Sequence, residues 1–422
     1  MTSRARVAKA INHEEPDRLP LDLGGSPVSG VQVSVVVALR QALGLPGPVK
    51  VVEPFQMLGE VDDDLRRALG VDTIGLGGRR TFFGFENRDW KPWRLFDGTE
   101  VLVPGAFNTD PEPNGDVLMY PEGDRSAPPS GRMPRGGFYF DAVIRQPPID
   151  EAALRVEDNL EEFGPVSDDE LAYFAREADR LSRETDLAIV ANFGGTSFGD
   201  IALVPGLSLK HPKGIRDVEE WYVSTLLRRG YVYEVFARQC EIGLSNLERI
   251  RQAVGDRVSV VFVTGTDFGT QRGPFASPTI YRELYQPFHR RVNDWVHART
   301  PWKTFIHTCG GVEPLIEDFI AAGFDILNPV QCSAAGMDPA HLKARYGDRI
   351  TFWGGGVDTQ RTLPFGTPEE VRDEVRRRIE VFAPGGGFVF NTIHNVQVGT
   401  PVENALALYR AVREHGEYGR RA

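Results

Sequence analysis

Cysteine is scarce in this sequence. Only three of its 422 residues are cysteines, namely Cys240, Cys309 and Cys332. Three thiols cannot form a disulfide framework in so long a chain, so the small disulfide-stabilised folds are excluded. This cysteine content suits a reducing compartment, where a thiol is free for metal binding or redox chemistry.

Long apolar runs and an excess of positive charge are also missing. No stretch of about 18 apolar residues occurs, and residues 1–10 contain no apolar core of signal-peptide length. Acidic residues outnumber basic ones by 59 to 48, which gives a net charge of −11. Such a chain is repelled by nucleic-acid backbones and by anionic membranes. We therefore expect a cytoplasmic protein with neither nucleic acid nor membrane as a partner.

The remaining composition is that of a globular protein of enzyme size, with 41% hydrophobic and 25% charged residues. Short apolar segments rich in β-branched residues alternate with helical patterns, and residues 54–69 carry one such helical pattern. Eight segments are predicted strands: residues 19–23, 71–74, 187–193, 258–264, 303–307, 324–328, 350–353 and 388–391. Strands that are apolar on both faces are typical of a parallel sheet covered by helices. We predict one α/β domain over residues 1–422, a (β/α)8 TIM barrel, with a doubly wound open sheet as the alternative.

Residues 79–148 interrupt this alternation. The segment is rich in glycine, proline and aromatic residues, and its short β-like pieces are joined by Asp-Gly and Asn-Gly turns. We predict an inserted β-rich segment that is either a lid over the substrate or a packing flap. Under the lid hypothesis, Trp93 and Tyr139 are candidate substrate-binding residues, because flat aromatic side chains suit an aromatic substrate.

Polar residues follow several of the predicted strands. Active sites of TIM barrels form at the carboxyl ends of the strands, so these residues are candidates for function. Asp267 ends an apolar strand next to glycine and is either a general acid or base or an anchor for a loop, and we favour the functional role. The candidate substrate-binding residues at the same ends are Asp22, Asn192, Gln271 and Asn328.

His307 and Cys309 lie two residues apart where a predicted strand opens into glycines. Alternation places both side chains on one face, and an imidazole with a thiol is a ligand pair for zinc. The alternative is a buried cysteine beside a core histidine. His394, just past the last predicted strand, is the predicted third ligand, and Cys332 is the weaker competitor. Three protein ligands with one open position are typical of a catalytic zinc site.

The segment 195–199, GTSFG, matches the G-x-S-x-G pattern of serine hydrolases. The match is weak, because that motif must lead straight into a helix and Pro205 and Gly206 interrupt the residues that follow. We therefore do not favour a hydrolase.

Five segments together resemble the uroporphyrinogen decarboxylase-like superfamily, and within it the cobalamin-dependent methyltransferase branch. They are PDR at 16–18, TGTDFGTQ at 264–271, HTCGG at 307–311, GGGVDTQ at 354–360 and PGGGFVFN at 384–391. The resemblance implies a (β/α)8 barrel and a zinc site with a His-x-Cys pair and a later cysteine. His307 and Cys309 match the pair, whereas His394 takes the later position and departs from the pattern.

The resemblance further implies methyl transfer between a small methylated substrate and cobalamin carried by a separate corrinoid protein. An aryl methyl ether is the favoured methyl donor, because the aromatic insertion resembles that of the O-demethylating members. Decarboxylation of uroporphyrinogen is not expected, since the N-terminal stretch has no arginine cluster beyond Arg18. The alternatives are a coenzyme-thiol methyltransferase and a catalytically silent barrel that binds a small molecule or a corrinoid.

Overall fold

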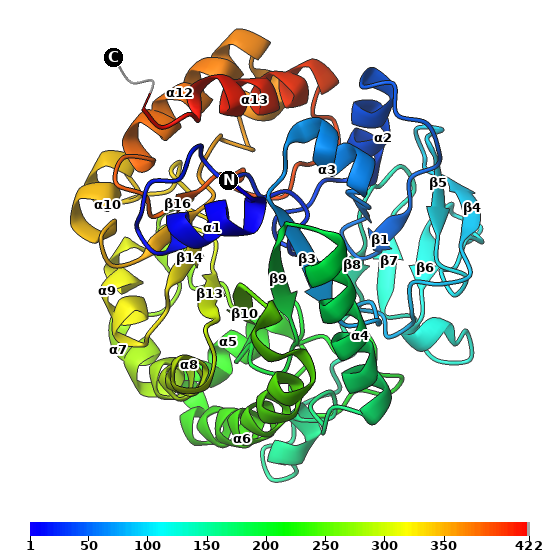
Figure 1. Ribbon diagram of the computed structural model, residues 1–422. Helices are drawn as coiled ribbons and strands as arrows, with labels where there is room; N and C mark the ends of the chain where they lie inside the picture. Colours follow the sequence, from blue (N-terminus) through cyan, green and yellow to red (C-terminus); the bar gives the residue numbers. More distant parts are fainter. Residues whose placement is uncertain (420–422) are drawn as a thin grey trace.

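The central feature of the molecule is a curled parallel sheet surrounded by helices (Figure 1). The structure is a computed structural model and describes residues 1–419. The sheet has seven strands in the order β16-β15-β14-β13-β10-β9-β3. Their bounds are β3 (Thr73–Gly77), β9 (Ala188–Asn192), β10 (Val260–Thr264), β13 (Lys303–His307), β14 (Ile326–Asn328), β15 (Thr351–Trp353) and β16 (Phe388–Val389). The predicted α/β barrel is confirmed, and seven of the eight predicted strands appear in it.

The eighth predicted strand closes the barrel without forming regular pairing. Leu21 makes a parallel bridge to Phe390 beyond β16, and the carbonyl of Leu21 accepts a bond from the amide of Asp72 before β3. Pro20 has no amide proton, and the amide of Leu21 donates to the Asp72 side chain instead of a neighbouring strand. The segment therefore lies in the eighth position of the barrel while lacking the hydrogen bonds of a full strand.

Helix α1 (Ser3–Ile11) covers the amino-terminal end of the barrel (Figure 1). Its residues Val7, Ala10 and Ile11 pack against the inward-facing side chains of the strands. These inward-facing residues follow the two-residue alternation of each strand and include Val190, Phe262, Phe305, Ile326, Trp353 and Val389. Because α1 covers one end of this interior, the polar residues at the carboxyl ends of the strands lie at the other end.

The outer layer consists of helices whose apolar faces pack on the sheet. Several begin at a side chain that caps the first turn, such as Ser167, Asp217 and Thr367, the last forming a capping box with Glu370. The helices are α2 (Val33–Ala42), α3 (Asp63–Leu69), α4 (Asp168–Glu184), α5 (Val218–Leu227), α6 (Arg229–Val254), α7 (Pro278–Ile280), α8 (Gln286–Arg299), α9 (Glu313–Ala321), α10 (Pro339–Tyr346), α11 (Thr362–Phe365), α12 (Pro368–Phe382) and α13 (Val402–His415). A π-helical segment, η4 (Tyr281–Tyr285), joins α7 to α8.

The helix predicted over residues 54–69 is wrong in its first half. Residues 58–59 form strand β2 (Leu58–Gly59), which pairs with β1 (Val51–Glu53), and the helix begins only after Asp62. The Asp62 side chain accepts from the amide of Leu65, which makes it a strong helix start. Met57 adopts a left-handed backbone with φ of 54°, which breaks the helical path before that point.

Residues 79–148 contain two small antiparallel sheets on one flank of the barrel (Figure 1). One sheet pairs β4 (Lys91–Arg94) with β5 (Glu100–Val103), and the other joins β6 (Val117–Met119), β7 (Gly131–Met133) and β8 (Asp141–Ala142). The rings of Phe83, Phe107 and Phe140 pack edge to face inside the insertion, with centroid distances of 5.6 and 5.7 Å to Phe140. The insertion therefore has an aromatic core of its own.

Within residues 1–419, none of the helices is both long enough and apolar enough to cross a lipid bilayer.

Candidate metal centre

The first residue of the candidate site is His307 at the end of β13. Alternation from Phe305 turns its ring into the barrel, and Asn328 is turned inward in the same way from Ile326 on the neighbouring β14. The two strands pair His307 with Asn328 directly, and His307 Nδ1 lies 2.7 Å from Asn328 Oδ1. Asn328 Nδ2 donates to the carbonyl of Trp353, so Oδ1 is the atom that accepts from His307. His307 Nδ1 therefore carries the proton, and Nε2 is free to bind a metal ion.

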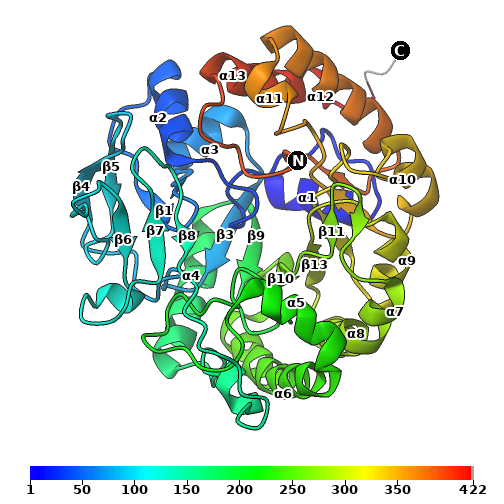
Figure 2. The same ribbon diagram turned by 180° about the vertical axis from the view of Figure 1, so that it is seen from behind.

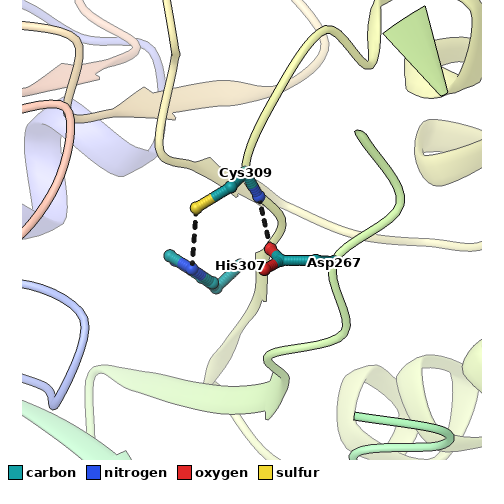
Figure 3. A group of neighbouring side chains, drawn as sticks. All are labelled: Asp267, His307 and Cys309. Atoms are coloured by element: carbon teal, nitrogen blue, oxygen red, sulfur yellow. Dashed lines mark hydrogen bonds between the residues drawn. The ribbon is translucent and has the colours of Figure 1, made fainter. Parts of the chain in front are cut away.

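Cys309 and Asp267 complete a cluster around Nε2 (Figure 3). Cys309 Sγ lies 3.5 Å from His307 Nε2, and the amide of Cys309 donates to Asp267 Oδ1 over 2.6 Å. The three potential ligand atoms all lie within 4.8 Å of one another. Nitrogen, sulfur and oxygen donors at such separations fit a tetrahedral zinc ion with one position left for another ligand.

Two loops bring these residues together. They follow the paired strands β10 and β13, and the amide of Phe268 donates to Thr308 Oγ1 over 2.8 Å. Their backbones touch at two glycines: a Cβ on Gly269 would lie 2.5 Å from the carbonyl oxygen of Cys309, and a Cβ on Gly310 would lie 2.3 Å from the carbonyl carbon of Gly269. Gly310 also has a φ of 88°, which side-chain-bearing residues rarely adopt. Any other residue at either glycine would push the two loops apart.

Burial sets the charges of the cluster. It raises the pKa of Cys309 well above its ordinary value, and the neighbouring charge of Asp267 adds to that shift. Burial also lowers the pKa of His307, against the opposing influence of Asp267 and Asn328. The metal-free protein therefore holds a neutral imidazole and a protonated thiol. Zinc binding would release the thiol proton, because zinc takes the thiolate.

His394, the predicted third ligand, is not part of the three-residue cluster. It lies in the loop after β16, where Gln397 Nε2 is 3.1 Å from its Nδ1. It is nevertheless near the cluster, because it shares a cavity with Gln331, whose Oε1 accepts from the amide of Gly310 beside Cys309. Burial lowers the pKa of His394. Its ring lines a cavity of about 220 Å³ together with Gln331, Thr359, Gln360, Ile393 and Gln397. Its role as a ligand stays a prediction.

Cys332, the competing third ligand, is also outside the cluster. Its Sγ lies 3.3 Å from the carbonyl oxygen of Val330, and burial raises its pKa to about 12. The structure therefore places this thiol against backbone carbonyls after β14. Of the candidate third ligands, Asp267 is the one that lies with His307 and Cys309.

Tyr139 connects the insertion to the loop that carries His394. Its hydroxyl accepts a hydrogen bond from the amide of Val398 over 3.0 Å. Trp93 is different, because its ring packs on Phe107 at a centroid distance of 5.0 Å within the insertion. Trp93 also lines an open groove of about 1050 Å³ between α2 and the β4–β5 hairpin. This placement gives Trp93 a packing role, and substrate contact by either residue stays a prediction.

Asp22 is held inside the barrel wall. Its two carboxylate oxygens accept from Thr73 Oγ1 over 2.5 Å and from Trp353 Nε1 over 2.8 Å. Burial raises its pKa. These contacts tie the irregular eighth segment to β3 and β15, which is a structural role. Its role in substrate binding stays a prediction.

The other predicted substrate-binding residues lie at the carboxyl ends of the strands, as expected. Asn192 ends β9, and its Oδ1 accepts from the amide of Gly194 over 3.2 Å. Gln271 Nε2 donates to Gln360 Oε1 over 2.8 Å and so joins the loops after β10 and β15. Asn328 accepts from His307 Nδ1, so its position suits a residue that orients a metal ligand.

Two residues near the cluster were missed by the sequence analysis. Asp200 lies in the loop after β9, and burial together with the charge of Asp267 raises its pKa to about 7. Tyr222 lies on α5, and burial, Asp267 and Asp200 raise its pKa to about 12. Asp200 is eight residues beyond β9 and Tyr222 lies inside a helix, so strand-end position gave no signal for either.

Comparison with known proteins agrees with this fold. Residues 252–415, which include the cluster and the last strands, match the family described as uroporphyrinogen decarboxylase (URO-D). This part of the chain is similar to that enzyme family, which confirms the resemblance found in the sequence.

Curated members of the superfamily match only part of the chain. Uroporphyrinogen decarboxylase of Psychromonas ingrahamii is 36% identical over 87 residues, which are 20% of this chain and 24% of that protein. The enzyme of Pseudoalteromonas translucida is 26% identical over 213 residues, covering 46% of this chain and 56% of that protein. The chain therefore spans about half or less of the length of these relatives.

A solved structure covers nearly the whole chain. A methyltransferase from Methanosarcina mazei aligns with a TM-score of 0.55 and 16% identity over 98% of this chain and 99% of that one. At this identity, the likeness establishes the shared barrel fold.

Proposed function

We propose that this protein is a zinc-dependent methyltransferase that moves a methyl group between a small methylated compound and a separate corrinoid protein. The observation that carries the proposal is the cluster of His307, Cys309 and Asp267 at the carboxyl end of the barrel. The fold shared with a methyltransferase supports it. We further propose an aryl methyl ether as the methyl donor, so that the reaction is an O-demethylation.

The residues of the cluster have distinct tasks under this proposal. His307, Cys309 and Asp267 would hold the ion, which supplies Lewis acidity when bound. Asn328 keeps the lone pair of His307 Nε2 directed at the cluster. Asp267 holds the backbone of Cys309 and fixes the position of the thiol. If the ion takes His307, Cys309 and His394 instead, Asp267 remains free to orient or protonate the substrate oxygen.

A second candidate, methylation of a coenzyme thiol, is favoured by one observation. Cys309 as thiolate and Asp267 as carboxylate together cancel the charge of a divalent zinc ion, whereas Cys309 with two neutral histidines leaves one positive charge. A neutral site suits a thiolate product or substrate, and a positive site suits an ether oxygen. Whether Asp267 or His394 is the third ligand therefore separates the two activities.

The test uses the zinc-loaded protein with two sets of reactants. In the first, cob(I)alamin and aryl methyl ethers are supplied, and formation of methylcobalamin is followed by its absorbance. In the second, methylcobalamin and small thiols are supplied, and loss of methylcobalamin is followed. We expect methyl transfer in the first set, and none with the matched Cys309→Ala variant. Transfer only in the second set would replace O-demethylation by thiol methylation, and transfer in neither would contradict a methyltransferase.

A further inference from the structure

The loop that follows β13 is held by side chains from both neighbouring loops. On one side, the amide of Cys309 donates to Asp267 Oδ1 over 2.6 Å. On the other side, the amide of Gly310 donates to Gln331 Oε1 over 2.7 Å. Gln331 lies in the loop after β14, and only 8% of its surface is exposed. It is therefore a buried polar residue that is bonded one peptide away from a candidate metal ligand.

The two hydrogen bonds fix the backbone on either side of Cys309. A peptide unit is planar, so the direction of a side chain depends on the two peptide planes that flank its Cα atom. Asp267 holds the plane before Cys309, and Gln331 holds the plane after it through the amide of Gly310. The carbonyl oxygen of this second plane lies against Gly269, where a Cβ would be 2.5 Å away. Both ends of the second plane are therefore in contact, which sets the direction of the thiol.

The rest of the loop is enclosed by the same two neighbours. Strand β11 (Gly269–Thr270) pairs with β12 (Gly273–Pro274) in the loop after β10, and it lies next to β13 in the view from the side opposite α1 (Figure 2). The carbonyl of Thr270 accepts from the amide of Gly311 over 2.8 Å. On the β14 side, a Cβ on Gly311 would lie 2.6 Å from the carbonyl oxygen of Ala335. The loop that carries the thiol is therefore packed between the loops after β10 and β14.

The segment that carries Gln331 also orients the candidate histidine ligand. Asn328 ends β14, and its Oδ1 accepts from His307 Nδ1 over 2.7 Å. Between Asn328 and Gln331, Val330 is fully buried. Its carbonyl oxygen lies against Gly355, where a Cβ would be 2.9 Å away. One tightly packed segment therefore supplies a hydrogen bond on behalf of each of the two predicted ligands.

We propose that Gln331 is a positioning residue of the metal centre. It acts through Cys309 and does not bind the ion: by holding the amide of Gly310, it keeps the thiolate directed at the metal site. The inference rests on the metal centre of the proposed function, and it holds whether Asp267 or His394 is the third ligand. Removing a hydrogen bond that orients a metal ligand weakens metal binding by about 10- to 100-fold.

The chemistry of the side chain allows its parts to be separated. Glutamine accepts through its oxygen and carries no charge, so it leaves the charge of the site to the ligands. Methionine is of similar length and is a much weaker acceptor, whereas glutamate accepts well and adds a negative charge. Comparing these three side chains at position 331 distinguishes the hydrogen bond from shape and from charge.

The test uses cobalt(II) in place of zinc, because a cobalt–thiolate bond absorbs visible and near-ultraviolet light and a zinc–thiolate bond does not. The metal-free protein and its variants are titrated with cobalt chloride, and the affinity and the position of the thiolate band are recorded. Gln331→Met should bind cobalt about 10-fold or more weakly and shift the band. Gln331→Glu restores an acceptor, so it should restore the wild-type band with at least the wild-type affinity.

A second measurement needs no metal. In the metal-free protein, hydrogen exchange of the Gly310 amide should be about 5-fold faster in Gln331→Met than in the wild type, as the loss of one hydrogen bond allows. Gln239→Met is the matched control, because Gln239 is also buried and its Nε2 donates over 3.3 Å to the carbonyls of Gly195 and Ser197. This control should leave the cobalt affinity, the band and the exchange of Gly310 unchanged.

The outcomes separate this inference from the proposed function. Unchanged cobalt binding in Gln331→Met, an equal loss in Gln239→Met, or an unrestored band in Gln331→Glu would overturn the positioning role. A wild-type protein that binds no cobalt would remove that role together with the metal centre. If cobalt binding responds as expected and no methyl group is transferred, the positioning role stands and the methyltransferase is contradicted.

Discussion

The two ends of the barrel handle buried charge in opposite ways. At the amino-terminal end, Arg6 donates to Asp72 over 2.6 Å and to Asp17 over 2.7 Å, and Arg18 donates to Asp72 over 2.7 Å. At the carboxyl end, Asp267 and Asp200 have no lysine or arginine partner among residues 1–419. Removing a carboxylate that is paired with buried arginines destabilises a fold. Carboxylates that lack a positive partner and lie near a histidine and a thiol instead mark a candidate site for a positively charged ligand.

The largest expected effect is at the carboxyl end and concerns the metal. We predict that the purified protein binds about one zinc ion per chain, as an open site with three protein ligands does. The His307→Ala, Cys309→Ala double variant should lose roughly 1000-fold or more in zinc affinity, because only one ligand of the cluster remains. Elemental analysis and competition with a chelator measure this. Cys332→Ser is the matched control and should retain zinc; undiminished zinc in the double variant would contradict the metal centre.

The same measurement identifies the third ligand. If Asp267 holds the ion, Asp267→Ala should weaken zinc binding far more than His394→Ala. The reverse order would support the ligand set predicted from the sequence resemblance. The first result would show that the metal ion supplies the charge that Asp267 lacks, and the second would leave Asp267 without a charged partner.

The second effect is at the amino-terminal end and concerns stability. Asp72→Asn should lower the free energy of unfolding by about 3–5 kcal/mol, because it leaves Arg6 and Arg18 without their shared carboxylate. The matched change Asp267→Asn keeps an acceptor for the Cys309 amide and should cost about 1 kcal/mol or less. Urea unfolding followed by circular dichroism measures both variants. If Asp72→Asn and Asp267→Asn lost similar amounts of unfolding free energy, the paired and unpaired carboxylates would not differ in their contribution to stability.

The smallest effect is a pH dependence with opposite signs at the two ends. The pKa of Asp200 is raised from 3.8 to about 7, mainly by burial. Between these values the unfolded chain has lost the proton and the folded chain retains it. The free energy of unfolding should therefore fall as pH rises from about 4 to about 7, by about 2–4 kcal/mol. The hydrogen bond from Arg6 lowers the pKa of Asp17, so its contribution is instead lost as pH falls below about 4.

Two variants of the metal-free protein check these signs. Asp200→Asn should flatten the decline between pH 4 and 7, since no ionisable group remains at that position. Asp17→Asn should flatten the loss in acid and leave the decline between pH 4 and 7 in place. A decline that persists unchanged in Asp200→Asn would show that another group causes it.

Much of the barrel is predictable from the sequence because its strands carry a local signal. Each strand is a short β-branched segment followed by a helical pattern, and seven of these segments form the sheet. The pairing of His307 with a neighbour on β14 also follows from alternation and parallel register. The irregular backbone of the eighth segment was not predictable from its apolar pattern. Pro20 has no amide proton, and the amide of Leu21 donates to the side chain of Asp72 instead of to a neighbouring strand.

The membership of the metal cluster was only partly predictable. The spacing of His307 and Cys309 pointed to a shared face. Asp267 was singled out as a catalytic residue, and its contact with Cys309 depends on the backbone packing of two loops. Loop packing of this kind leaves no periodic pattern in a sequence.

The insertion shows a second limit. Its aromatic residues suggested a substrate-covering surface, yet Phe140 and Trp93 pack against Phe107 in its own core. Composition reveals that aromatic surface is present, and only the fold shows which rings face one another. Tyr139 could be distinguished from them only through its bond to Val398.

The contact between Gly269 and Gly310 has a consequence for protein engineering. The cluster owes its geometry to two positions that contribute no donor atom. Grafting His307, Cys309 and Asp267 onto the strand ends of an unrelated barrel would reproduce the ligands and lose their separation, because the recipient loops would carry side chains where these loops touch. A working graft would therefore have to include both glycines together with the three ligands. The smallest segment that could be transferred is the pair of contacting loops after β10 and β13.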